Sequence, residues 1–431
     1  MIENIQQTRF ENGLTILTDQ MPNVRSVTLG FFFRVGARHE PAELHGISHF
    51  IEHTVFKGTA RRTALEIAIE QDRLGGNLDA FTTHEETGFA IKVIDEQLPR
   101  AFDLLADMLF EPLFEERDLQ SEQKVIIEEM KMIDDSPEEY LGEIFNQAFF
   151  PDHPLGKSIA GTPATVRSFN RDRTADYHRR VFTPSNLIIA AAGNIGHEQI
   201  VELAQAVLSS NFSLLSGSEG QLKLELETTV PTLAAPIVIK HRTDLEQAHL
   251  IIATPMVVAT DPRRYAADML SNIIGGGTSS RLWQKVREER GLAYSVGASA
   301  LMYQDCGLFS VFAGTSPEQV REVVEIVVNE LRDVVSNGVR QDELELAKQQ
   351  SVASILLSLE DSASRAGAMA QSEMVHGRQI TVEETLENVA SVTLEDVAAL
   401  AREYFRSDAI AFAALGDIKG LKITREDLGL N

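Results

Sequence analysis

The sequence predicts an α+β protein built from two similar halves. At 431 residues the chain exceeds the size that one hydrophobic core usually serves, so two or more domains are expected. Strand-like segments, either alternating or continuously apolar, are followed by segments with apolar residues every three to four positions, as in helices. This order occurs twice, on either side of a stretch rich in Ser, Gly, Thr and Pro.

The first half begins with two predicted strand regions, within 8–18 and at 27–35. A helix is expected over the histidine-rich segment that follows, and Gly75 and Gly76 end the next helix, at 64–74. Strands at 78–82, 88–94 and 187–192 and helices at 98–109, 116–133, 139–149 and 197–208 complete this half.

The second half repeats this order. Its predicted strands are at 251–255, 293–301 and 308–313, and its predicted helices at 265–274, 280–290, 317–335 and 342–357. Short sequence matches support a duplication: DEQL at 95–98 resembles PEQV at 317–320, and RDL at 117–119 resembles DEL at 342–344. We therefore predict an N-terminal half at 1–213, a linker at 214–234 and a C-terminal half at 235–431.

Composition and charge narrow the class of protein. Hydrophobic residues make up 43% and charged residues 24%, as in an ordinary globular protein. The formal net charge of −25 argues against binding to nucleic acid or to anionic membrane surfaces. The same charge would attract cationic partners such as basic peptides, although acidity that only maintains solubility explains it equally well.

Cellular location is predicted from three features. Cys306 is the only cysteine, so no intrachain disulfide can form and a reducing compartment fits. The first residues have neither a basic nor an apolar region of a secretory signal, and no apolar run approaches 18 residues. A cytoplasmic protein is expected.

The segment 45–59 contains the strongest chemical motif, His49-x-x-Glu52-His53. On a helix, residues four apart lie on one face, so both imidazoles can reach one metal ion. Glu52 leans to the same side and can reach a water held by that ion. This is the H-x-x-E-H order of the inverzincins, and histidines satisfied within a core are the weaker alternative.

A third ligand is expected from the helix 116–133. Glu122 and Glu129 differ by only about 20° around the helix axis and fall on its apolar stripe, where burial is costly without a cation or a donor. We assign Glu129 as the ligand and Glu122 as an acceptor that orients a metal-bound histidine. Glu128 points toward solvent, and His45 lies about 12 Å from His53 along a helix. An acidic surface helix is the alternative that spacing alone leaves open.

These segments resemble the M16 (pitrilysin-type) metallopeptidases, and in particular the small bacterial branch similar to the mitochondrial processing peptidase β subunit. The resemblance rests on 45–59, on GGNLDAFT at 75–82, on the Glu122 and Glu129 helix and on GGGTSSRL at 275–282, and it covers essentially the whole chain. It implies two halves, each a mixed, mostly antiparallel sheet covered by helices, facing each other across a cleft.

The resemblance also implies a reaction. One Zn²⁺ per chain would be bound by His49, His53 and Glu129, and Glu52 would take a proton from a zinc-bound water that attacks the peptide bond. The substrate, a peptide or unfolded segment, would add as an extended strand to a sheet edge.

Further substrate-binding residues follow from the same resemblance. Arg287 and Tyr294 match a family pair that binds substrate and stabilises the oxyanion. Asp79 and Ala80 lie in the stretch expected beside the substrate backbone, and Asp79 replaces the usual Asn, which would favour basic peptides or weaken binding.

Two other functions remain open. The chain could be a catalytically silent scaffold like the core subunits of a respiratory complex, or a subunit that needs a partner for activity. Because the ligands, the base and the Arg287 and Tyr294 pair all occur in one chain, we predict a self-sufficient homodimeric zinc endopeptidase.

Overall fold

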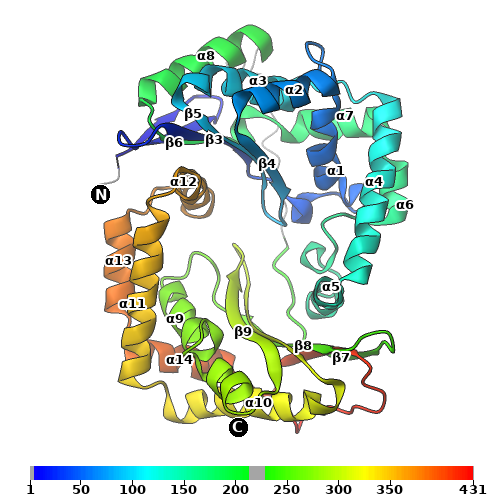
Figure 1. Ribbon diagram of the computed structural model, residues 1–431, viewed down its shortest axis with the longest axis vertical. Helices are drawn as coiled ribbons and strands as arrows, with labels where there is room; N and C mark the ends of the chain where they lie inside the picture. Colours follow the sequence, from blue (N-terminus) through cyan, green and yellow to red (C-terminus); the bar gives the residue numbers. More distant parts are fainter. Residues whose placement is uncertain (1–3, 213–228, 431) are drawn as a thin grey trace. The chain divides into compact units, whose positions relative to one another are not determined.

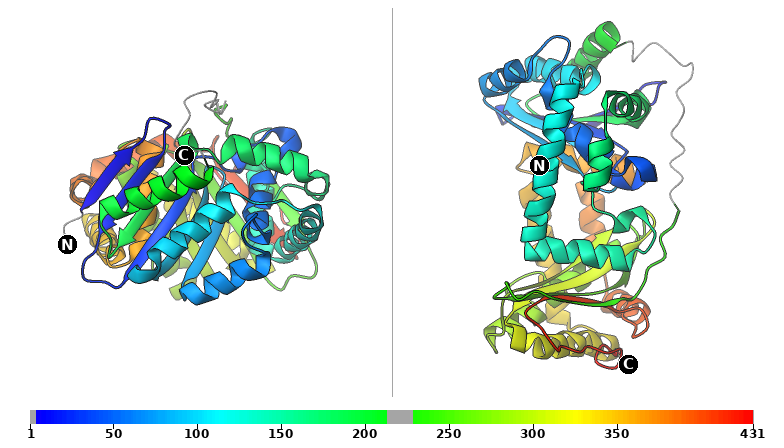
Figure 2. Two further views of the ribbon diagram at one scale, coloured as in Figure 1. Left: turned by 90° about the horizontal axis from the view of Figure 1, so that it is seen from above. Right: turned by 90° about the vertical axis from the view of Figure 1, so that its right-hand side faces the viewer.

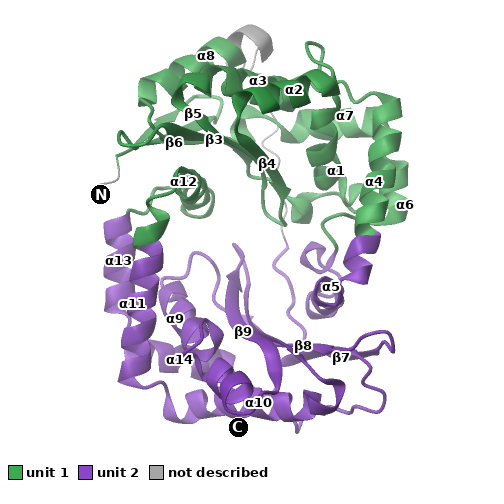
Figure 3. Ribbon diagram, viewed as in Figure 1, with its two compact units in different colours: residues 1–130, 158–228, 356–381 green, residues 131–157, 229–355, 382–431 purple. Residues whose placement is uncertain are grey.

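The computed structural model describes residues 4–212 and 229–430 (Figure 1). Residues 214–228 of the predicted linker therefore lie outside the described residues. The chain divides into two compact units (Figure 3). Unit 1 comprises Met1–Met130, Ser158–Thr228 and Leu356–Thr381, and unit 2 comprises Lys131–Lys157, Thr229–Ile355 and Val382–Asn431. Each unit therefore includes a segment from the other half of the chain. None of the described helices has the length and apolarity needed to cross a bilayer.

Unit 1 is built on a six-stranded sheet in the order β1-β2-β6-β3-β5-β4. The strands are β1 (Ile5–Arg9), β2 (Thr15–Gln20), β3 (Ser26–Phe33), β4 (Asn77–Thr82), β5 (Thr87–Ile94) and β6 (Leu187–Gly193). Only β2 and β6 pair in parallel, which gives the mixed, mostly antiparallel sheet that was expected. The predicted strand region at 8–18 contains the end of β1 and most of β2, and Gly13 takes a φ of +94° in the turn between the two strands.

Helices cover both faces of this sheet. On one face, α3 (Leu98–Phe110) and α8 (His197–Phe212) lie side by side (Figure 2). On the other face lies α12 (Ser362–His376), which comes from the second half of the chain and whose Ala366 and Met369 pack against Leu17 and Phe32. Buried apolar side chains on both faces are what holds the sheet together.

Unit 2 has a five-stranded sheet in the order β7-β11-β8-β10-β9. Its strands are β7 (Ile237–His241), β8 (Ala248–Met256), β9 (Ala293–Met302), β10 (Gly307–Thr315) and β11 (Ala411–Gly416). One face is covered by α9 (Arg264–Gly275), α10 (Val320–Asn337) and α14 (Leu394–Tyr404). The other face is covered by α5 (Pro137–Phe149), which comes from the first half of the chain.

The predicted repeat of element order is confirmed. In unit 1, β3 is followed by α1 (Ile47–Thr54), α2 (Ala64–Leu74), β4, β5, α3 and α4 (Glu116–Asp135). The corresponding series is β8, α9, η7 (Trp283–Glu288), β9, β10, α10 and α11 (Gln341–Ser358). The helix predicted at 280–290 is thus largely a short π-helical turn, η7.

Candidate metal centre

The histidine-bearing helix α1 begins at a fixed point. Gly46 takes a φ of +95°, and an added Cβ there would lie 2.6 Å from the carbonyl oxygen of Ala160, so only glycine fits. The Glu40 carboxylate is buried and accepts hydrogen bonds from the backbone N–H groups of Gly46 and Ser48, both at 2.7 Å. An acceptor at a helix N-terminus satisfies free donors and complements the helix dipole.

The two faces of α1 differ in character. Ile47, Phe50 and Ile51 are fully buried in the core of unit 1. Because side chains three and four residues apart share a helix face, this anchoring leaves His49, Glu52 and His53 together on the other side.

The structure brings Glu129 of α4 to the two histidines. Its Oε2 lies 3.8 Å from His49 Nε2 and 3.6 Å from His53 Nε2. The two imidazole rings are 4.6 Å apart between centroids, and the three ligand atoms lie within 4.8 Å of one another. Zinc bonds of about 2.0–2.2 Å would draw these atoms somewhat closer.

The donor set fits a divalent cation. Glu129 Oε2 is buried and has no hydrogen-bond partner among the described residues, although it lies between two imidazole nitrogens. A buried carboxylate oxygen without a donor is costly, and a cation would remove that cost. Two nitrogens and one carboxylate oxygen are a ligand set that zinc uses when it keeps a fourth position open.

Glu122 lies behind His53, where a partner for the other ring nitrogen was predicted. Its Oε2 is 3.3 Å from His53 Nδ1 and its Oε1 is 2.7 Å from Lys57 Nζ. Burial raises the pKa of Glu122, but the bonds from His53 and Lys57 outweigh burial and hold that pKa below its usual value. An anionic Glu122 keeps the proton of His53 on Nδ1, which leaves Nε2 free to face Glu129.

The two histidines have different proton affinities. Burial, followed by the nearby charge of His53, lowers the pKa of His49 to about 4. Burial also lowers the pKa of His53, but Glu122, Glu129 and Glu52 outweigh it and raise that pKa above its usual value. His49 therefore presents an unprotonated nitrogen at neutral pH.

Glu52 is held from the neighbouring strand. Its Oε2 accepts a 2.7 Å hydrogen bond from the hydroxyl of Thr82, the last residue of β4. Burial raises the pKa of Glu52, and the Thr82 bond and His53 oppose that rise. Glu52 is thus a partly desolvated carboxylate beside the three candidate metal ligands, an environment in which carboxylates can act as bases.

The other predicted site residues are not among the three candidate metal ligands. Asp79 and Ala80 are on β4, which pairs only with β5 among the described strands, and the Asp79 carboxylate accepts a 2.6 Å hydrogen bond from Asn77. In unit 2, Arg287 donates a 2.7 Å hydrogen bond to the carbonyl oxygen of Tyr294 and lies over its ring, at 4.6 Å. Tyr294 is 77% exposed.

Three residues of this centre were not predicted: Glu40, Lys57 and Thr82. Lys57 lies four residues after His53, so helical spacing was an available signal for it. Glu40 and Thr82 are joined to α1 by tertiary contacts, and the sequence carries no short motif that would show them.

Comparison with known proteins places this geometry in context. A family model described as Insulinase (Peptidase family M16) matches residues 15–163, and one described as Peptidase M16 inactive domain matches residues 168–351. The chain is 38% identical over 403 residues to an uncharacterized zinc protease of Streptomyces coelicolor, covering 93% of this chain and 87% of that protein. It is 36% identical over 404 residues to the uncharacterized zinc protease YmxG of Bacillus subtilis, covering 94% and 96%.

Two solved structures share the fold. A protease from Helicobacter pylori matches with a TM-score of 0.86 at 21% identity, covering 96% of this chain and 100% of that chain. A peptidase M16 inactive domain from Pseudomonas fluorescens matches with a TM-score of 0.88 at 20% identity, covering 97% and 100%.

Proposed function

The chain belongs to the M16 peptidase family, and from that premise we propose that it is a zinc-dependent endopeptidase acting on peptides or unfolded segments. The observation that carries the proposal is the convergence of His49, His53 and Glu129, with an unpartnered Glu129 oxygen between two imidazole nitrogens. The curated relatives are named zinc proteases, which supports zinc as the cation.

One zinc ion per chain would be held by His49, His53 and Glu129. When bound, zinc would act as a Lewis acid that polarises the scissile carbonyl and lowers the pKa of a zinc-bound water toward 7. Glu52 accepts the proton released as the water attacks and passes it to the leaving amine. The hydroxyl of Thr82 keeps the Glu52 carboxylate in place during both transfers.

Substrate binding is proposed at the free edge of β4, where a peptide can add as a further strand and Asp79 and Ala80 lie beside it. The acidic chain, with its net charge of −25, favours basic peptides. From the family resemblance, we also propose that Arg287 and Tyr294 bind substrate and stabilise the oxyanion. We also propose a cytoplasmic homodimer that needs no second protein.

The test replaces Glu52 by Gln and measures hydrolysis of a peptide mixture together with zinc content. Because a positioned general base contributes about 10²–10⁴-fold, Glu52→Gln should lower kcat by that factor and keep stoichiometric zinc. Glu43→Gln, at an exposed carboxylate before α1, is the matched control and should keep full activity. Full activity of Glu52→Gln would refute the proposal, and a wild-type protein with neither zinc nor activity would favour a silent scaffold.

A further inference from the structure

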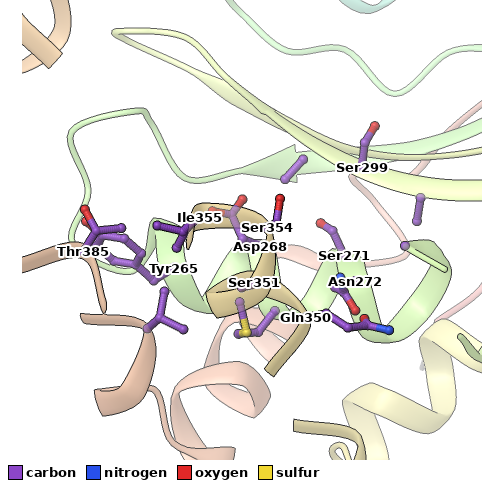
Figure 4. A pocket seen from close by; sticks show the side chains of 15 residues that line it. Tyr265, Asp268, Ser271, Asn272, Ser299, Gln350, Ser351, Ser354, Ile355 and Thr385 are labelled. Carbon is purple, nitrogen blue, oxygen red and sulfur yellow. The ribbon is translucent and has the colours of Figure 1, made fainter. Parts of the chain in front are cut away.

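Unit 2 contains a pocket of about 520 Å³ whose lining residues include several with polar side chains (Figure 4). Its walls come from α9, β9, α11 and α13 (Val382–Ser391). The polar side chains that line it are Tyr265, Asp268, Ser271, Asn272, Ser299, Gln350, Ser351, Ser354 and Thr385. All the lining residues belong to unit 2.

The pocket corresponds to the metal centre of unit 1. In the repeated series, α9 takes the place of α1, β9 the place of β4 and α11 the place of α4. Asp268, Ser271 and Asn272 have the spacing of His49, Glu52 and His53, namely three and then one residue apart. The side chains that carry the chemistry in unit 1 thus have counterparts on the same face of the corresponding helix.

The second helix gives the same correspondence. Leu119 is buried and lies three residues after the first residue of α4. Leu344 is also buried and lies three residues after the first residue of α11. Counting from these leucines, Glu129 corresponds to Ser354, which lines the pocket. Two independent segments therefore place the pocket where the first half has its metal-binding group.

The chemistry of the pocket is nevertheless different. Both imidazoles and the Glu129 carboxylate are replaced by one carboxylate, an amide and a hydroxyl, a set too poor in ligands for zinc. A pocket of several hundred Å³ is also the size that small organic ligands occupy, rather than a bare ion.

Asp268 determines the charge that such a ligand would carry. It is the only charged side chain that lines the pocket, and no described residue forms a hydrogen bond or ion pair with its carboxylate. It is reached by solvent from the pocket, yet the surrounding protein raises the pKa of its carboxyl to about 6, and nearby Arg264 opposes that rise. A carboxylate that has no partner among the described residues attracts a cationic ligand.

We propose that this pocket binds a protonated primary amine, with the Asp268 carboxylate as its counter-ion and hydrogen-bonding groups of Asn272, Gln350 and Ser354 around it. Figure 4 shows these side chains arranged along α9 and α11 at the pocket. Two sources share this chemistry: a free small amine and the side chain of a lysine in a peptide. The site is independent of the reaction proposed for unit 1.

Calorimetric titration of the purified full chain tests the proposal with three probes. These are N-acetyl-lysine methylamide, n-butylamine and the uncharged N-acetyl-norleucine methylamide. We expect the lysine derivative to bind at least tenfold more tightly than the norleucine derivative. Equal binding of n-butylamine and the lysine derivative would identify a free amine as sufficient, and a tenfold preference for the lysine derivative would identify a peptide side chain.

Variants locate the site. Asp268→Asn, which keeps the shape of the side chain, and Ser354→Leu, which fills the pocket, should each weaken the amine probe at least tenfold. Asp342→Asn removes the same charge from an exposed position outside the pocket and should bind like wild type. Glu52→Gln should also bind like wild type, which separates this proposal from the catalytic one. Binding that Asp268→Asn leaves unchanged, or no preference for the charged probe, would overturn it.

Discussion

Glu122 is placed to set which nitrogen of His53 faces Glu129, although Glu122 itself is not one of the three candidate metal ligands. Removing its charge leaves the ring orientation less well defined and the nitrogen less basic. We predict that Glu122→Gln weakens zinc binding about 10–100-fold, measured by competition with a chelator. Glu116→Gln, at an exposed carboxylate on the same helix, is the control, and equal zinc affinity of both variants would contradict the assigned role.

His178 makes the stability of unit 1 depend on pH. Burial lowers its pKa to about 4, while its Nε2 is hydrogen-bonded to the carbonyl oxygen of Leu109 at 2.8 Å. The unfolded chain binds a proton near pH 6.5 and the folded chain only near pH 4, so stability present above pH 6.5 is lost as the pH falls toward 4.

The loss of unfolding free energy with falling pH can be measured as a slope. The shift corresponds to at most about 3.4 kcal/mol of unfolding free energy. Denaturant unfolding between pH 7 and pH 4.5 should show a steeper loss in wild type than in His178→Gln, whose amide can still donate to Leu109. Identical slopes for the two proteins would show that His178 binds its proton at the same pH in the folded and the unfolded chain.

For single residues, the sequence predicts those site residues that lie close together in the chain or on one face of a helix. His49, Glu52 and His53 share one turn-and-a-half of helix, and Glu129 follows from an acidic residue on an apolar stripe. Thr82 and Glu40 could not be predicted, because their hydrogen bonds depend on where a strand end and a short turn are placed by tertiary packing.

The position of helix α1 depends on the hydrogen bonds made at its first turn. The Glu40 carboxylate accepts two backbone hydrogen bonds there, and a glutamine oxygen can take over only one of them without bringing an amide N–H against the other donor. Glu40→Gln should lower the free energy of unfolding by about 1.5–3 kcal/mol and weaken zinc binding as well. Glu43→Gln should change neither quantity, and a Glu40→Gln protein as stable as wild type would show that these bonds do not hold the helix.

Among the elements, those with strong periodicity were predicted well. The helix predicted at 64–74 matches α2, and the helix predicted at 139–149 matches α5 within two residues. The partner of α5 could not be predicted, because an apolar helix face does not specify which of two similar sheets it covers. Likewise, α12 was not predicted, and it packs on the sheet of unit 1.

For the whole molecule, the placement of α5 and α12 ties the two halves of the chain together. Asp19 of β2 pairs with Arg365 of α12 in a buried ion pair at 2.5 Å, so unit 1 is incomplete without a segment from the second half. Unit 2 in turn buries Phe145 and Phe149 of α5 from the first half.

This arrangement predicts the behaviour of a cut chain. If a protease site is inserted between residues 213 and 228 and cleaved to completion, both fragments should elute together in size-exclusion chromatography under native conditions. Residues 1–212 expressed alone should lack a cooperative unfolding transition, because the apolar surface that α12 covers is exposed. Fragments that separate and each unfold cooperatively would contradict the exchanged packing.

The predicted duplication is the feature of the whole molecule that the sequence showed best, and the repeated order of elements confirms it. The predicted division at 1–213 and 235–431 follows the repeat along the chain, whereas the compact units also exchange 131–157 and 356–381. Sequence similarity between halves reports common topology, and it carries no information on which copy a given helix joins.

Anomalous diffraction at the zinc edge, on crystals of the wild-type protein, would show directly whether His49, His53 and Glu129 bind zinc. We expect one zinc peak per chain, bonded to His49 Nε2, His53 Nε2 and the Glu129 carboxylate at about 2.0–2.2 Å. A peak at other residues, or no zinc signal in protein that hydrolyses peptides, would contradict it.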